Sequence, residues 1–126
     1  MLEKVTERAR YSDQELQEFK TLIQEKISEA RERLKYYLDQ LADFGKTEDA
    51  KVRGLDDGIN SIESDHLATM ASRQRKLINH LEGALVRIEN KTYGVCRVTG
   101  KLISKQRLMA VPHATLSIEA KNRLAH

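Results

Sequence analysis

An apolar stripe runs through the first third of the chain and constrains its fold more than any other feature of the sequence. Hydrophobic side chains recur in steps of three or four residues, which places them on one face of a helix. They are Leu16, Phe19, Ile23, Ile27, Ala30, Leu34, Tyr37, Leu41 and Phe44. Ser12 and Glu15 have the spacing of a capping box, in which a hydroxyl and a carboxylate bond reciprocally to backbone N–H groups at a helix start. The pattern predicts an amphipathic helix of about thirty residues, roughly 45 Å long.

A second apolar stripe follows a region that contains Gly45, Gly54 and Gly58. Its members form a heptad seam with one polar member, Gln74. They are Leu67, Met70, Gln74, Leu77, Leu81, Ala84 or Leu85, and Ile88. Each stripe needs a partner, and the simplest partner for each is the other. We therefore expect an antiparallel helical hairpin with an acidic tip near residues 45–61; pairing between two chains in a dimer is the alternative.

The hydrophobic pattern changes after Asn90. Short β-capable runs flank a Thr99-Gly100 turn, which predicts a small β-hairpin. Residues 114–125 have the propensity of a closing helix, with Thr115 as the expected cap. The sequence thus predicts a mainly α fold: a long antiparallel helical hairpin, or coiled coil, over residues 1–90 and a small C-terminal lobe over residues 91–126.

Length and composition exclude several classes of function. A chain of 126 residues has little room for a deep enzyme cleft, and no catalytic constellation accompanies its carboxylates. No stretch approaches the length of an apolar membrane span, and residues 1–10 lack the pattern of a secretion signal, so we expect a cytoplasmic protein. Cys96 is the only cysteine, which excludes an intrachain disulfide and a complete thiolate zinc site.

Charge is distributed unevenly along the chain. The segment from Asp43 to Asp65 is mainly acidic. From Lys91 onward, Glu119 is the only acidic residue. The basic residues of this segment are Lys91, Arg97, Lys101, Lys105, Arg107, Lys121 and Arg123. Such a polarity bears on partners and association rates rather than on fold.

The C-terminal segment carries a long motif, Tyr93-Gly94-x-Cys96-x-x-Thr99-Gly100-x-x-Ile103, continued by Arg107-Leu108-x-Ala110-x-Pro112-x-Ala114-x-Leu116-Ser117-x-x-Ala120. This motif resembles the finger of the DksA/TraR family. In that family four cysteines normally hold one zinc ion, and the corresponding positions here are Cys96, Thr99, Ser117 and Ala120. Because three of the four thiolates are missing, we expect neither zinc nor any other cofactor.

Without zinc, packing of apolar side chains has to hold the lobe together. Each such residue, if buried, contributes about 1.5 to 3 kcal/mol. The candidates for this core are Val95, Val98, Leu102, Ile103, Leu108, Val111, Leu116 and Ile118.

The resemblance implies a bacterial transcription regulator that binds RNA polymerase, inserting its coiled coil into the secondary channel without sequence-specific DNA contact. An ungapped alignment places the family's acidic tip on residues 53–58, where Asp56 matches an acidic position, Asp57 is an extra acid and Arg53 replaces an Asp. A solvated turn is the alternative interpretation of Asp56 and Asp57. Whether a nucleotide alarmone cooperates stays open.

Several basic residues are candidates for partner binding, although each also suits a water-facing position. They are Arg73, Arg75, Lys76, Lys101, Lys105 and Arg107. We expect a monomeric regulator that is not an enzyme. The alternative function is a coiled-coil adaptor or oligomeric scaffold that has lost the polymerase role; a nucleic-acid binder that uses the basic lobe is a third interpretation.

Overall fold

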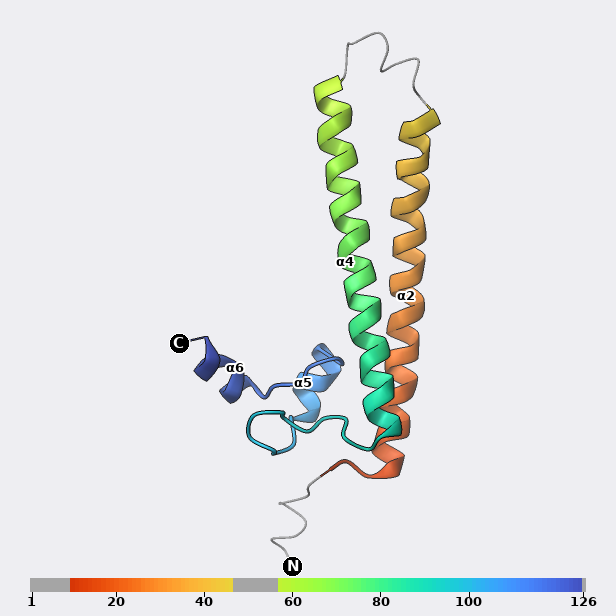
Figure 1. Cartoon of the computed structure of the whole chain (residues 1–126). Coiled ribbons are helices and arrows are strands. Elements are labelled where there is room, and N and C mark those ends of the chain that lie inside the picture. Colours follow the sequence, from red (N-terminus) through yellow and green to blue (C-terminus); the bar gives the residue numbers. More distant parts are fainter. Residues whose placement is uncertain (1–9, 47–56, 126) are drawn as a thin grey trace, which may run out of the picture. The chain divides into compact units, whose positions relative to one another are not determined.

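The fold is mainly helical, as the sequence predicts. The structure, a computed structural model, describes residues 10–46 and 57–125. It contains two long helices, α2 (Asp13–Lys46) and α4 (Asp57–Glu89), and two short ones, α5 (Lys105–Ala110) and α6 (Ile118–Leu124) (Figure 1). The chain divides into two compact units: the described residues 10–26 with 80–125, and residues 27–79. The domain boundary expected at residue 90 stays a prediction.

The start of α2 confirms the capping box. The backbone N–H of Ser12 donates to Glu15 Oε1 at 3.0 Å, and the backbone N–H of Glu15 donates to Ser12 Oγ at 3.2 Å. These two bonds satisfy N–H groups that would otherwise lack partners at the first turn. Helix α2 accordingly begins at Asp13, directly after the capping serine.

In the unit of residues 27–79, the two long helices lie side by side and run antiparallel (Figure 1). Ile27 and Ala30 are buried on α2, and Ala71 and Ile78 on α4. The polar seam residue has a partner across the pair, because Arg33 Nε donates to Gln74 Oε1 at 3.2 Å. The hairpin prediction is confirmed, but a strict heptad omits Ala71 and Ile78 because the buried face of a globular helix is wider than two positions in seven.

In the other unit, the lobe shares one core with the adjacent ends of α2 and α4. Aromatic rings connect α2 to the lobe. The ring centroid of Phe19 lies 5.4 Å from that of Tyr11 and 5.1 Å from that of Tyr93. Both tyrosine hydroxyls donate to lobe carbonyls, Tyr11 to Ile103 and Tyr93 to Pro112. The fully or nearly fully buried residues of this core are Tyr11, Leu16, Phe19, Ile23, Leu81, Ala84, Ile88, Tyr93, Cys96, Ile103, Leu108, Ala114 and Ala120.

The lobe departs from the prediction in its strands. The expected β-hairpin is reduced to one antiparallel bridge, between Val95 and Leu102, and the described residues contain no longer strand. Positive φ angles at Gly94 (78°) and Gly100 (73°) bend the chain on both sides of Cys96. These bends explain why the β-capable residues around Cys96 form a single bridge and no longer β-ladder.

The closing helix also begins later than expected. Helix α6 starts at Ile118 and is capped by Ser117, whose side chain accepts from the backbone N–H of Ala120. Thr115 is not the cap because its carbonyl and hydroxyl oxygens both accept hydrogen bonds from Arg97.

The predicted lobe core is only partly correct. Ile103 and Leu108 are fully buried, but Val98 and Ile118 are 47% and 50% exposed. The residues that fill the core in their place are Tyr93, Cys96, Ala114 and Ala120. Among the residues that the structure covers, no helix is long and apolar enough to span a bilayer.

Candidate functional site

The four positions that correspond to zinc ligands lie close together in the lobe. The backbone N–H of Ser117 donates to Cys96 Sγ at 3.4 Å, and Ser117 Oγ accepts from the N–H of Ala120 at 3.2 Å. Thr99 and Ser117 line the same pocket. These contacts link Cys96 to Ser117 and Ser117 to Ala120, and place Thr99 beside the same pocket as Ser117.

These residues do not fit a zinc ion. Structural zinc requires four ligands, usually thiolates and imidazoles. Only Cys96 offers such an atom, Ala120 offers none, and Ser117 Oγ already caps a helix. Within residues 10–46 and 57–125, no group of three His, Cys, Asp or Glu side chains is placed to hold a metal.

Cys96 retains a polar environment of the kind that suits a thiolate. Burial raises the pKa of its thiol, but hydrogen bonds outweigh this and lower the pKa to about 6. The donors are the Thr99 side chain and the backbone N–H groups of Ser117, Thr99 and Val98. Because the side chain is 1% exposed, this anionic character is screened from solvent.

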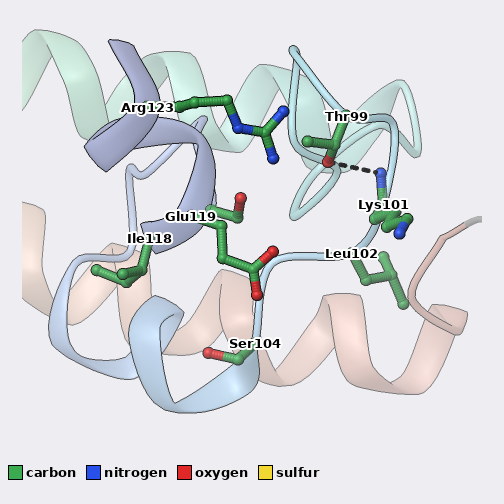
Figure 2. Close-up of a pocket in the computed structure, with 8 residues that line it drawn as sticks. Thr99, Lys101, Leu102, Ser104, Ile118, Glu119 and Arg123 are labelled. Atoms are coloured by element: carbon green, nitrogen blue, oxygen red, sulfur yellow. Dashed lines mark hydrogen bonds between the residues drawn. The ribbon is translucent and has the colours of Figure 1, made fainter. Parts of the chain in front are cut away.

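A pocket of about 350 Å³ opens beside the former ligand positions (Figure 2). It lies between the 99–104 segment and the first turns of α6. Its lining is Thr99, Lys101, Leu102, Ser104, Ser117, Ile118, Glu119 and Arg123. Among these residues, the sequence predicted Lys101 as a candidate for partner binding. It did not indicate Glu119 and Arg123, because only the folded lobe brings them to the same pocket as Lys101.

The three basic lobe residues predicted to bind a partner have different surroundings. Lys101 is exposed at the pocket. Lys105 Nζ lies 2.7 Å from Glu15 Oε2, and the hydrogen bond with Glu15 raises the pKa of Lys105. Arg107 Nε donates to the Leu116 carbonyl at 2.8 Å. Lys105 and Arg107 thus have intramolecular partners, and their role in binding stays a prediction.

Two of the three basic residues predicted on α4 line one pocket, and the third lies outside it. Arg73 and Lys76 line a shallow pocket of about 440 Å³ with Asp65, Ala68, Thr69 and Ser72. Arg75 is exposed but does not line it. At the predicted tip, Asp56 lies outside the described residues, and Asp57 is the first residue of α4.

A histidine pair that the sequence did not indicate joins the lobe to α4. The rings of His80 and His113 stack with centroids 5.4 Å apart and planes 24° apart. Arg87 also donates to the His113 carbonyl at 3.4 Å. Burial, then the neighbouring His80 and Arg87, lower the pKa of His113, which favours its neutral form. His113 Nδ1 is buried without a partner among the described atoms.

Comparisons with known proteins point to one family. The family model of the prokaryotic dksA/traR C4-type zinc finger matches residues 91–124. The RNA polymerase-binding transcription factor DksA of Caulobacter vibrioides is 45% identical over 65 residues, 50% of this chain and 46% of that protein. General stress protein 16O of Bacillus subtilis is 32% identical over 80 residues, 56% and 49% of the two chains. The chain thus spans about half the length of these curated relatives.

A solved structure extends the likeness to most of the chain. The transcription factor DksA2 from Pseudomonas aeruginosa superposes with a TM-score of 0.80 at 28% identity, over 87% of this chain and 82% of that one. The likeness therefore covers the helical hairpin as well as the lobe. Residues 91–124 thus match the DksA/TraR finger, and the chain as a whole is similar to DksA proteins, but three of its four zinc-ligand positions carry residues other than cysteine.

Proposed function

We propose that this protein binds RNA polymerase in the bacterial cytoplasm and regulates transcription, with its helical hairpin in the secondary channel and without reading DNA sequence. The observation that carries the proposal is the likeness to the transcription factor DksA2 over 87% of the chain. The name of the Caulobacter relative, an RNA polymerase-binding transcription factor, supports the choice of partner. The proposal gives the chain no catalytic role.

The surface of α4 supports a contact with a large partner. Arg73 and Lys76 line the shallow pocket on this helix together with the small side chains Ala68 and Ser72 and with Asp65. Small residues let a partner approach the helix backbone closely, and the two cations favour an acidic partner surface. We assign Arg73, Arg75 and Lys76 to binding of the polymerase.

The carboxylates at the tip have a different role in the proposal. Asp56 and Asp57 would approach the polymerase catalytic centre and change initiation, while the helices provide the affinity. Arg53 replaces an acidic residue of the family motif, so Asp57 supplies the second negative charge of this tip.

The double variant Asp56→Asn/Asp57→Asn tests this division of roles. We expect it to bind the cognate polymerase with unchanged affinity and to lose most of its effect in a multi-round transcription assay, because the change removes charge but keeps side-chain shape. The matched control is Asp39→Asn/Asp43→Asn, which removes two exposed carboxylates from α2. Transcription that responds equally to the tip variant and to wild type would remove the tip from the mechanism.

A further inference from the structure

The pocket beside α6 contains hydroxyl groups that are oriented by the backbone. Ser104 Oγ accepts from the N–H of Arg107, and Ser117 Oγ accepts from the N–H of Ala120, each at 3.2 Å. A hydroxyl oxygen that accepts one bond keeps its own hydrogen for donation to another group. The Thr99 hydroxyl differs, since it is bonded to Cys96. Ser104 and Ser117, which both line the pocket, therefore each keep a hydroxyl hydrogen that can be donated to a bound group.

Two cations and one carboxylate complete the polar lining. From α6, the Glu119 carboxylate extends toward Ser104 and Leu102, and the Arg123 guanidinium extends toward Thr99; Lys101 lies on the opposite segment, next to Thr99 (Figure 2). Within the part of the chain that the structure describes, none of the three charged groups forms an ion pair. With Lys101 and Arg123 against Glu119, the pocket lining carries a net charge of +1, which favours anions.

We infer that this pocket binds hydrogen phosphate. Lys101 and Arg123 neutralise the anion, and the hydroxyls of Ser104 and Ser117 donate to its oxygens. A carboxylate repels a fully deprotonated anion but accepts a hydrogen bond from a protonated one. Glu119 therefore selects an oxyanion that still carries a proton.

This selection distinguishes phosphate from other anions of similar size. Inorganic phosphate keeps at least one proton at neutral pH, whereas sulfate has none to give to Glu119. A loss of one hydrogen bond to a charged group corresponds to roughly tenfold in affinity or more. The inference concerns the isolated chain and does not rest on the proposed polymerase function.

The test is a titration of the full chain with inorganic phosphate and, separately, with sodium sulfate, at pH 7 and low ionic strength. Backbone amide shifts in NMR spectra report the binding of each anion. We expect saturable shifts around residues 99–104 and 117–123, with phosphate bound about tenfold more tightly than sulfate. Equal affinities for the two anions, or shifts that do not saturate, would overturn the inference.

Two substitutions sharpen the test. Glu119→Gln should bind phosphate and sulfate equally, because an amide donates to either anion. Arg123→Ala should weaken phosphate binding by about tenfold. Lys121→Ala is the matched control, since it removes an exposed cation from the same helix outside the pocket. If Lys121→Ala weakens binding as much as Arg123→Ala, general charge attraction explains the effect and the site is refuted.

Discussion

Gly94→Ala is expected to destabilise the protein far more than Gly100→Ala, although both glycines have positive φ angles of 78° and 73°. A Cβ atom at Gly94 would lie 2.6 Å and 2.7 Å from ring carbons of Tyr11 and 3.2 Å from Leu108 Cδ1. A Cβ atom at Gly100 would meet nothing within 4 Å. Backbone strain costs roughly 1 to 2 kcal/mol at either position. Overpacking at Gly94 adds about 1 to 3 kcal/mol.

The measurement is urea denaturation of the two variants, followed by tyrosine fluorescence because the chain contains four tyrosines and no tryptophan. Gly100→Ala is the control for backbone strain alone. The difference between the two free energies of unfolding reports how tightly the backbone at residue 94 packs against Tyr11. Equal losses of stability would mean that Tyr11 does not pack there, which contradicts the shared core of the lobe and α2.

The triple variant Thr99→Cys/Ser117→Cys/Ala120→Cys is expected to gain a structural zinc site. Cys96 and Ser117 are already in hydrogen-bond contact, Thr99 bonds to Cys96, and Ala120 lies in the first turn of α6. Four thiolates at these positions match a tetrahedral site. Binding of zinc to such sites releases about 10 to 16 kcal/mol at neutral pH, so the melting temperature should rise strongly when zinc is added.

Competition with a chromophoric chelator measures the zinc affinity of the triple variant. Wild type, which has one thiol, is the first control and should not compete. A quadruple variant that also carries Cys96→Ser is the second control and should bind zinc much more weakly. If the triple variant competes no better than wild type, the four positions do not converge as the structure has them.

Local sequence patterns were sufficient to predict the helical hairpin. The capping box at Ser12 and the three-to-four periodicity depend on residues one turn apart, and they are the interactions that determine where a helix begins and which face it buries. The resemblance to the DksA/TraR finger also rests on a single continuous segment, residues 93–120. These features account for the confirmed helical fold and for the match of residues 91–124 to the zinc-finger family model.

The contacts that fix the lobe were not predictable in the same way. Tyr11 bonds to Ile103 across 92 positions, and His80 stacks on His113 across 33, so neither pair leaves a periodic signal. The choice of Ser117 over Thr115 as the helix cap depended on the bonds of Thr115 to Arg97. The pocket beside α6 requires residues from two segments, and only the folded lobe brings Lys101 and Arg123 to one pocket.

Binding of the wild-type chain to RNA polymerase, measured with a strong zinc chelator present from cell lysis onward, tests most directly whether this is a zinc-independent polymerase regulator. We predict a saturable complex whose affinity is the same with and without chelator, because the lobe is held by packed side chains and tyrosine hydrogen bonds. Failure to bind the polymerase, or binding that is lost on chelation and restored by zinc, would contradict that conclusion.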